Sequence, residues 1–354
     1  MSLRILSVAY PLAPVSLDAA GGAEQVLAAI DRGLVERGHE SVVIACEGSG
    51  IRGTLLPTPK PGGTLDERAK RLARANHRAA IASVLAKSRF DLVHLHGVDF
   101  YEYLPPAGVP VLATLHLPPE WYPANVFLSR PCTWLQCVSA AQVRRCPPCA
   151  MLLGHVANGV PARLFRDQPP RRSFALALGR ICPEKGFHLA LDAAEMAGVP
   201  LVIAGELYDY PEHQSYFQNE LLPRLNGGNC RFLGPVGFEK KRKLLGQARC
   251  LLVPSVAPET SSLVAMEAMA SGTPVVAFAS GALPEIVEHG RTGYLVANAA
   301  EMAAAMALVD RIDPDECRRA ARERFSEDRM IADYLALYSR ISTMTAAREM
   351  VHEP

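Results

Sequence analysis

The sequence lacks any excess of charge of one sign, since 37 Lys and Arg stand against 36 Asp and Glu in 354 residues. This balance excludes a general electrostatic attraction to nucleic acid, and we expect no nucleic-acid partner. No apolar run approaches the ~18–20 residues that a membrane-spanning helix needs. The opening residues MSLRILSVAYP lack the long apolar core and cleavage site of a signal peptide. We therefore expect a cytoplasmic protein.

Cysteine is present, but the nine residues are an odd number without secretory context, so no disulfide framework is expected. Four of them lie close together in the sequence: Cys132, Cys137, Cys146 and Cys149. Four thiolates could hold zinc, and Cys146-Pro-Pro-Cys149 could form a reversible disulfide. The irregular spacing favours free thiols over both alternatives.

Short apolar runs alternate with helical stretches, and nearly continuous Val, Ile and Leu runs are typical of strands buried in a parallel sheet. The length fits two domains better than one. We therefore predict an α/β protein with two doubly wound, Rossmann-like domains. The predicted strands are residues 3–10, 41–46, 91–96, 110–116, 133–139 and 152–159, then 174–179, 200–205, 230–234, 250–254, 274–279 and 293–296.

The predicted connection between the domains follows Asn158-Gly159-Val160 and runs through the polar, Pro-containing residues 165–172. The first domain is placed at residues 1–165 and the second at residues 166–325. A last helix is predicted over about residues 326–345, because buried-type side chains recur there at helical spacing: Met330, Tyr334, Leu337, Tyr338 and Ile341.

Residues 254–285 join a strand, a loop with Glu259 and a helix. The helix is predicted to begin near Ser261 or Ser262, because either serine suits the N-cap position. It is predicted to end before Gly272, because glycine commonly follows a helix and the next residue but one is proline.

The start of this helix is a predicted anion site. Its first backbone N–H groups, from Ser262, Leu263 and Val264, can bind a phosphate. Glu259 precedes the helix, and Glu267 lies on the same helix face as Leu263. Two carboxylates beside a phosphate pocket suit a ligand with many hydroxyls around a diphosphate, such as a sugar nucleotide.

The string PETSSLVAMEAMASGTPVV, with GALPEIVEHGRTG after it, resembles the donor site of retaining glycosyltransferase family 4, also called glycosyl transferases group 1. Glu259 and Glu267 reproduce the family's Glu-x7-Glu spacing. Thr260-Ser261-Ser262 departs from the family's frequent Gly-Phe-Gly, which leaves the donor open. The resemblance implies the GT-B fold, with an acceptor domain and a donor domain whose parallel sheets face an interdomain cleft.

Further motifs extend the resemblance over nearly the whole chain. Gly21-Gly22-Ala23-Glu24 matches a turn that lies beside the donor diphosphate in the family; it is not G-x-G-x-x-G, so a nicotinamide dinucleotide is poorly supported. GRICPEKG places Arg180 and Lys185 in the family's diphosphate-binding pattern. The loop with Gly234 and Val236 matches the one that holds the base. Without the resemblance, a flexible loop and solvated basic residues remain the alternatives.

Three histidines end predicted strands, His94, His96 and His116. Each by itself is more readily explained as a satisfied structural residue. His116 is the exception, because Ala-Thr-Leu-His after a strand matches the family's active-site histidine, which implies a contact with the donor sugar. The same resemblance places residues 118–122 near the acceptor, where aromatic faces suit sugars or apolar groups.

A helix predicted over residues 64–87 has an apolar face of Leu65, Ala69, Leu72, Ala80 and Val84 and a basic face of Arg68, Lys70, Arg71, Arg74 and Arg78. Such a basic run is usually solvated. A peripheral membrane contact, bringing a lipid-linked acceptor to the first domain, is the alternative.

The resemblance implies an enzyme that moves a hexosyl group from a nucleotide diphosphate sugar to an acceptor hydroxyl with retention. UDP is the expected base because it is frequent in the family; the acceptor, whether saccharide, lipid-linked or small molecule, is open. Arg180 and Lys185 would stabilise the departing diphosphate without a metal or cofactor. Glu259 would hold sugar hydroxyls and Glu267 ribose hydroxyls. A sugar phosphorylase and a catalytically silent sugar-nucleotide-binding protein remain alternatives on the same fold.

Overall fold

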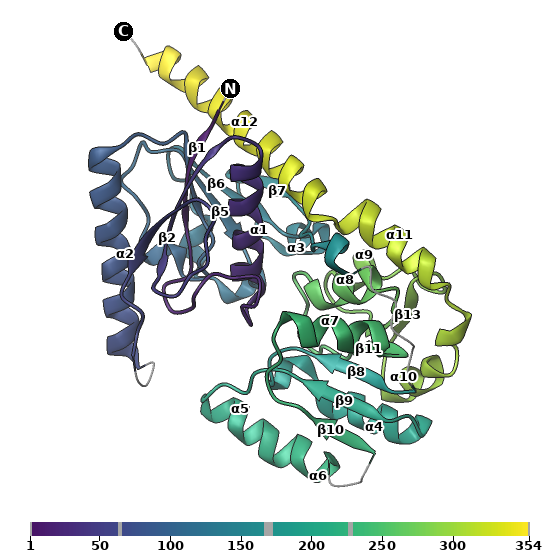
Figure 1. Ribbon diagram of the computed structural model, residues 1–354. Coiled ribbons are helices and arrows are strands. Elements are labelled where there is room, and N and C mark those ends of the chain that lie inside the picture. Colours follow the sequence, from purple (N-terminus) through teal and green to yellow (C-terminus); the bar gives the residue numbers. More distant parts are fainter. Residues whose placement is uncertain (1, 63–65, 166–172, 226–228, 353–354) are drawn as a thin grey trace. The chain divides into compact units, whose positions relative to one another are not determined.

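The protein is described by a computed structural model that covers residues 2–62, 66–165, 173–225 and 229–352. The chain divides into two compact units, each with its own sheet (Figure 1). Unit 1 comprises Met1–Ala157 and Met330–Pro354, and unit 2 comprises Asn158–Arg329. The boundary expected after residue 165 therefore falls inside unit 2, and residues 166–172 of the expected connection lie outside the described residues.

Unit 1 contains a seven-stranded sheet in the order β3-β2-β1-β4-β5-β6-β7, and all of its strand pairs are parallel. Every strand predicted for this part of the chain is present. The sequence did not predict β3, an edge strand that contains proline, which strands tolerate only at such positions. The strands are β1 (Arg4–Val8), β2 (Glu40–Cys46), β3 (Thr54–Thr58), β4 (Leu92–Leu95), β5 (Val111–Leu115), β6 (Thr133–Cys137) and β7 (Leu152–His155).

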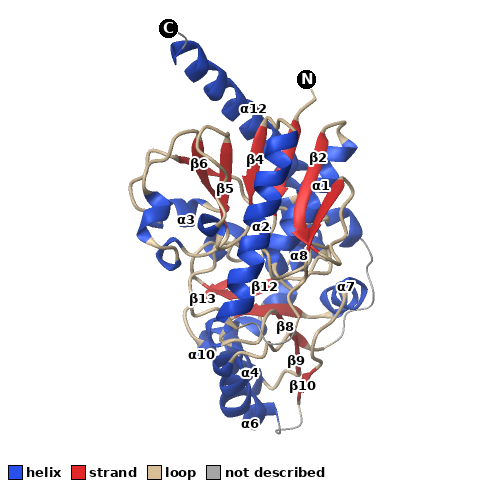
Figure 2. Ribbon diagram, turned by 90° about the vertical axis from the view of Figure 1, so that its left-hand side faces the viewer, coloured by secondary structure: helices blue, strands red, loops and turns tan. Residues whose placement is uncertain are grey.

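Helices cover both faces of this sheet. Leu27 of α1 (Gly22–Glu36) shares a buried cluster with Val43 of β2, whereas Ile81 of α2 (Glu67–Lys87) shares another with Ile44. Successive strand residues point to opposite faces, so α1 and α2 lie on opposite sides of the sheet (Figures 1 and 2). The other helices are η1 (Phe100–Glu102), η2 (Pro119–Trp121), η3 (Ala124–Phe127), α3 (Ala140–Arg145) and α12 (Glu327–His352), which belongs to unit 1 from Met330.

The buried face of α2 differs from the predicted one. Its fully buried residues are Ala73, His77 and Ile81, while Leu72 is 62% exposed. The prediction was therefore wrong for Leu72, and Leu65 lies outside the described residues. In a helix with so few apolar residues, spacing alone allows either assignment, and the packing partner decides which face is covered.

The basic face of α2 is partly used inside unit 1. Arg74 forms an ion pair of 2.7 Å with Asp99, Lys70 forms one of 2.8 Å with Glu67, and Arg78 donates to the carbonyl oxygen of Glu102. These contacts leave fewer cations available for an anionic surface than the sequence suggested. In the described part of the chain no helix has the length and apolar character that crossing a bilayer requires.

Unit 2 repeats the plan with a six-stranded parallel sheet in the order β10-β9-β8-β11-β12-β13. All strands predicted for this part are present: β8 (Ala175–Leu178), β9 (Leu201–Ala204), β10 (Cys230–Phe232), β11 (Cys250–Val253), β12 (Val275–Phe278) and β13 (Gly293–Val296).

The helices of unit 2 bury apolar side chains on its sheet; Leu191 of α4 and Met302 of α10, for example, share one cluster with Ile203 of β9. They are η4 (Ala162–Phe165), η5 (Pro183–Lys185), α4 (Phe187–Ala197), α5 (Pro211–Tyr216), η6 (Phe217–Leu221), α6 (Leu222–Leu225), α7 (Phe238–Gln247), α8 (Leu263–Ala270), α9 (Leu283–Ile286), α10 (Ala299–Met306), η7 (Val309–Arg311) and α11 (Pro314–Phe325).

The two places where the chain enters and leaves unit 2 are joined to each other. Val160 N–H donates to Phe325 O at 2.8 Å, and Glu327 N–H donates to Val160 O at 3.1 Å. A Cβ at Gly159 would lie 2.6 Å from the carbonyl oxygen of Ser326, so a larger residue would not fit. The Asn-Gly-Val motif therefore pairs with the segment before α12.

The predicted apolar face of the last helix is buried in unit 1. Its side chains are at most 8% exposed: Met330, Tyr334, Leu337, Tyr338 and Ile341. Figure 1 shows α12 in yellow as one continuous helix. The helix thus completes the core of unit 1 from the far end of the sequence.

We predict that His77→Phe flattens the dependence of stability on pH. His77 is fully buried against the ring of Tyr103, and burial lowers its pKa from 6.5 to about 4. Between these values the unfolded chain binds more protons than the folded chain, so the free energy of unfolding falls as pH falls. Removing the imidazole should reduce this slope by up to about 1.4 kcal/mol per pH unit.

The measurement is denaturant unfolding of both proteins at pH 7 and pH 5. His155→Phe is the matched control, because His155 is exposed and its replacement should leave the slope as it is. An unchanged slope in His77→Phe would contradict the assignment of His77 as a buried neutral residue.

Candidate functional site

The loop between β11 and α8 brings Glu259 to Lys185 at the end of η5. Lys185 Nζ lies 2.6 Å from Glu259 Oε1, and the hydroxyl of Ser255 donates to the same carboxylate. The Glu259 side chain is 9% exposed and that of Lys185 is 26% exposed. The pair is thus shielded on most sides while the ammonium still reaches the surface.

Two glycines allow the backbone approaches that hold this loop. Gly186 has φ +65°, and a Cβ there would lie 2.2 Å from Pro254 O; Gly281 has φ +58°, and a Cβ there would lie 2.2 Å from Glu259 O. Ala282 N–H donates to Glu259 O at 2.8 Å. Any side chain at either glycine would both strain the backbone and displace the loop.

The helix α8 begins and ends where the sequence predicts. Ser262 is its N-cap residue and Gly272, with φ +78°, follows its C-terminus. The side chain of Ser262 makes no capping hydrogen bond, and Ser261 Oγ is buried without a hydrogen-bond partner among the described residues. Leu263 and Val264 at the helix start are half-buried. The start of α8 therefore has polar groups that its own fold leaves unused.

The second acid of the Glu-x7-Glu pattern is buried and paired. Glu267 is 3% exposed, and Lys241 Nζ of α7 lies 2.6 Å from its Oε1. Burial raises the pKa of the Glu267 carboxyl, and the Lys241 ammonium opposes that rise. Lys241 was not among the predicted site residues, because the run FEKKRK reads as a solvated helix face. Only the packing of α7 on α8 distinguishes it from its neighbours.

The other predicted donor residues of unit 2 lie at the same edge of its sheet. Arg180 is exposed after β8, and its charge acts on neighbouring Glu184. Gly234 follows β10 with φ +68° and accepts from Gly205 N–H at 2.9 Å; Val236 is half-buried in the same loop. Because these loops follow neighbouring parallel strands, they gather at one carboxyl edge.

In unit 1 the predicted glycine turn starts α1. Gly21 is the N-cap residue of α1, and Gly22 is its first residue. A Cβ at Gly21 would lie 1.9 Å from Glu24 Oε2, so the buried Glu24 carboxylate folds back over the glycine. A larger residue at Gly21 would therefore require the Glu24 side chain to move.

His116 is half-buried at the end of β5 and contacts buried His96, which in turn contacts buried His94. His116 Nε2 lies 3.4 Å from His96 Nδ1, and His96 Nε2 lies 3.1 Å from His94 Nδ1. Burial lowers the pKa of His116 to about 4, and the pKa values of His94 and His96 lie well below 6.5 for the same reason. All three imidazoles are therefore neutral at pH 7. His94 and His96 are structural, as their positions in the sequence favoured.

Hydrogen bonds fix the proton on His94. The Gln136 amide donates through Nε2 to the carbonyl oxygen of Cys137, so its Oε1 must accept the proton of Thr114 at 2.7 Å. With that proton used, Thr114 Oγ1 accepts from His94 Nε2–H at 2.8 Å. His94 Nδ1 is then the acceptor for the hydroxyl of Tyr338 at 2.7 Å. Tyr338 of α12 is thus hydrogen-bonded to His94, the histidine of the cluster farthest from His116.

The residues after His116 only partly match their expected position near an acceptor. Tyr122 is buried, and its hydroxyl accepts the backbone N–H groups of His116 and Leu117 at 3.0 and 3.1 Å. Glu120 pairs with Arg145 at 2.8 Å. Trp121 is 51% exposed and is the aromatic residue of this segment that presents a free face. Tyr122 therefore shapes the His116 loop instead of offering its ring to a ligand.

Comparison with known proteins assigns both units. The family model for "Glycosyltransferase Family 4" matches residues 20–147, and that for "Glycosyl transferases group 1" matches residues 164–328. The chain belongs to glycosyltransferase family 4. Its two parallel-sheet, Rossmann-like units are those of the GT-B fold, so the predicted fold class and the predicted enzyme class are confirmed.

Individual relatives of this glycosyltransferase agree with the assignment. It is 26% identical to phosphatidyl-myo-inositol mannosyltransferase of Mycolicibacterium smegmatis, over 89% of this chain and 87% of that one. AviGT4, a glycosyltransferase involved in avilamycin A biosynthesis, matches with TM-score 0.72 and 26% identity over 96% and 98% of the two chains. HepE of Anabaena, solved with UDP-glucose, has the same fold with TM-score 0.71 and 19% identity over 94% and 99%.

Other matches are shorter. This chain spans 44% and 46% of two D-inositol 3-phosphate glycosyltransferases, from Mycolicibacterium smegmatis and from a Nocardioides species, at 33% and 32% identity.

The cysteines of the glycosyltransferase are all free thiols. Cys137 Sγ lies 3.5 Å from Cys146 Sγ, so the close pair differs from the Cys146–Cys149 pair that the sequence suggested. Among the described residues, no three of the clustered cysteines come close enough to share a metal ion. The zinc alternative for this cluster is therefore not supported.

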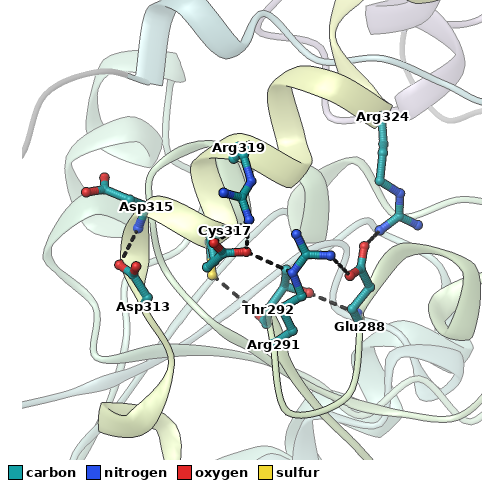
Figure 3. A network of polar contacts seen from close by, with 9 residues as sticks. Glu288, Arg291, Thr292, Asp313, Asp315, Cys317, Arg319 and Arg324 are labelled. Atoms are coloured by element: carbon teal, nitrogen blue, oxygen red, sulfur yellow. Dashed lines mark hydrogen bonds and ion pairs between the residues drawn. The ribbon is translucent and has the colours of Figure 1, made fainter.

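Residues 288–292, which precede β13, build a polar network with α11 (Figure 3). Arg291 bonds Glu288 at 2.7 Å and Glu316 at 2.8 Å, and Arg324 also bonds Glu288. The Asp-x-Asp triplet at residues 313–315 lies here, where Asp313 caps α11 by accepting from Asp315 N–H at 2.9 Å. These residues stabilise the edge of unit 2, and the acidic triplet serves as a helix cap.

We predict that Lys241→Met destabilises the protein by about 3–5 kcal/mol, because Glu267 would be left buried without its counter-charge. The double variant Lys241→Met/Glu267→Gln should recover most of this loss, since it removes both charges. Denaturant unfolding measures both. Lys240→Met is the control, because Lys240 is exposed on the same helix. A Lys241→Met protein as stable as the parent would contradict the buried pairing.

Proposed function

We propose that this glycosyltransferase moves a hexosyl group from a nucleotide diphosphate sugar to an acceptor hydroxyl, retains the anomeric configuration, and needs no metal for the transfer. The expected donor is a UDP-sugar. The observation that carries the proposal is the Lys185–Glu259 pair, at the carboxyl edge of the unit 2 sheet and in the loop that leads into α8. Unit 2 is the proposed donor domain and unit 1 the proposed acceptor domain.

The proposed chemistry follows from where charge develops. Cleavage of the bond between the anomeric carbon and the phosphate oxygen places negative charge on the departing diphosphate. Lys185, exposed Arg180 and the N–H groups at the start of α8 are positive groups available to stabilise it. The buried hydroxyl of Ser261, which has no hydrogen-bond partner in the described part of the chain, is a further donor next to that helix start. Such fixed donors act without reorganisation during the reaction.

The two acids have different environments and hence different proposed roles. Glu259 is held by Lys185 and Ser255, which keeps its carboxylate oriented toward sugar hydroxyls that would bind beside the ammonium. Glu267 is deeper; burial raises the pKa of its carboxyl and the Lys241 ammonium opposes that rise. Glu267 is proposed to accept hydrogen bonds from ribose hydroxyls. The loop with Gly234 and Val236 is proposed to contact the base.

Retention of configuration needs no nucleophilic side chain in this proposal. The acceptor hydroxyl attacks from the face that the diphosphate leaves, and a phosphate oxygen of the departing group takes the hydroxyl proton. His116 is proposed to contact the donor sugar as a neutral imidazole, because its pKa of about 4 keeps it uncharged at pH 7. Gly21 and Gly22 are proposed to let the backbone approach the diphosphate.

The comparisons support the donor class in a limited way. HepE of Anabaena has this fold and was solved with UDP-glucose. The relative aligned over most of the chain is a mannosyltransferase by name. A hexose on a nucleotide diphosphate therefore agrees with both, and a saccharide, a lipid-linked molecule or a small molecule can supply the acceptor hydroxyl.

We predict that Lys185→Ala and Arg180→Ala each lower kcat/KM by about 10²–10³-fold, as expected when one preorganised donor to a developing anion is lost. Nucleotide release from UDP-, GDP-, ADP- and TDP-sugars is measured, after a thermal-shift screen has identified the donor that binds. The melting temperature should change little for Arg180→Ala, because Arg180 is exposed, and should fall for Lys185→Ala, because the shielded Glu259 loses its counter-charge.

The matched control is Arg322→Ala, which removes an exposed cation from α11 of the same unit. Full activity in either site variant would remove that residue from the proposed mechanism. Phosphate-dependent release of sugar 1-phosphate in place of nucleotide would replace the transferase proposal by a phosphorylase.

A further inference from the structure

A second cluster of reactive groups lies beside the Lys185 loop and has no part in the proposed transfer. Cys182 Sγ, a carboxylate oxygen of Glu184 and a ring nitrogen of His213 all lie within 4.8 Å of one another. Two of the residues flank Pro183 at the start of η5, and the third is in the first turn of α5. Of the described residues, these three form the set of His, Cys, Asp and Glu side chains that comes close enough to share an ion.

The cluster combines a buried thiol with a buried ring nitrogen. Cys182 is 2% exposed, and its Sγ lies within 4.8 Å of a Glu184 carboxylate oxygen. His213 Nδ1 is buried and has no hydrogen-bond partner among the described residues. An unpartnered buried nitrogen is costly, and a ligand that accepts its lone pair would remove that cost.

We propose that Cys182, Glu184 and His213 bind one Zn²⁺ ion. Sulfur, imidazole nitrogen and carboxylate oxygen are the three ligand types that zinc takes in proteins, and three protein ligands leave the fourth position to water. Ligand atoms around tetrahedral zinc lie about 3.3–3.8 Å apart, so the observed spacing requires only a small side-chain adjustment.

The charges balance when the ion binds. The Cys182 thiol gives up its proton to solvent, and the resulting thiolate, together with the Glu184 carboxylate, neutralises the two positive charges of zinc. A soft thiolate ligand also selects zinc over Mg²⁺ or Ca²⁺, which prefer oxygen. The nearby Arg180 weakens cation binding by repulsion but does not occupy the ligand position.

The ion would hold the loops that carry Lys185 and Glu259 in place without taking part in the glycosyl transfer. Glu184 also accepts, through its backbone oxygen, the N–H groups of Val256 at 2.9 Å and Ala257 at 3.4 Å. These two residues belong to the loop that carries Glu259. A zinc ion at this place therefore ties the start of α5 to the same turn that positions Lys185 and Glu259, while the transfer itself stays free of metal.

The test is Co²⁺ titration of the purified full chain after removal of metal with a chelator, in a thiol-free reductant and without any sugar nucleotide. We expect a near-ultraviolet thiolate-to-cobalt band, visible absorption typical of tetrahedral Co²⁺, about one Co²⁺ per chain, and loss of all three signals when Zn²⁺ is added. Cys182→Ser should abolish the thiolate band, and His213→Gln should raise the cobalt dissociation constant at least about tenfold.

Cys230→Ser and Cys146→Ser are the matched controls, because both replace half-buried cysteines outside this cluster and should leave the spectrum unchanged. Far-ultraviolet circular dichroism of each metal-free variant shows that the fold is kept; if Cys182→Ser fails this check, His213→Gln decides. Absence of the thiolate band, or its loss in Cys146→Ser in place of Cys182→Ser, overturns the proposal. Because no substrate is present, this result is independent of the transferase activity.

Discussion

The pairing of the parallel strands β8 and β11 determines which loops meet at the carboxyl edge of the unit 2 sheet. Lys185 follows the first of these strands and Glu259 follows the second, and their ion pair of 2.6 Å forms because adjacent parallel strands end at the same edge. Gly186 and Gly281 then permit backbone approaches that no other residue could make. The order of the strands, together with the absence of a side chain at Gly186 and Gly281, thus brings together two residues that are far apart in the sequence.

The acids of the Glu-x7-Glu pattern differ in a way that spacing alone does not reveal. Glu259 lies in the loop before α8, where Lys185 and Ser255 hold its carboxylate. Glu267 is instead enclosed, and the Lys241 ammonium opposes the rise that burial causes in the pKa of its carboxyl. Both acids are therefore paired with a lysine, and the pair of Glu267 is the more deeply buried of the two.

Structural elements that a local and repeated sequence pattern specifies could be predicted from the sequence. The buried strands, the bounds of α8 and the apolar face of α12 followed from hydrophobic runs, cap residues and helical spacing. Lys241, the covered stripe of α2 and the Cys137–Cys146 contact could not be predicted in this way. Each depends on which neighbouring element packs against the residue, and β3 was missed because a proline-containing edge strand resembles a loop.

The route of the chain also limits how the molecule can be divided. Unit 1 takes its core from both ends of the sequence, since Tyr334 and Tyr338 of α12 reach the histidines behind His116. A fragment that stops at residue 157 would leave that polar interior open to water and without its tyrosine hydroxyls. An isolated unit 1 would therefore have to be made by circular permutation or by grafting residues 330–354 onto residues 1–157, and simple truncation would yield an incomplete core.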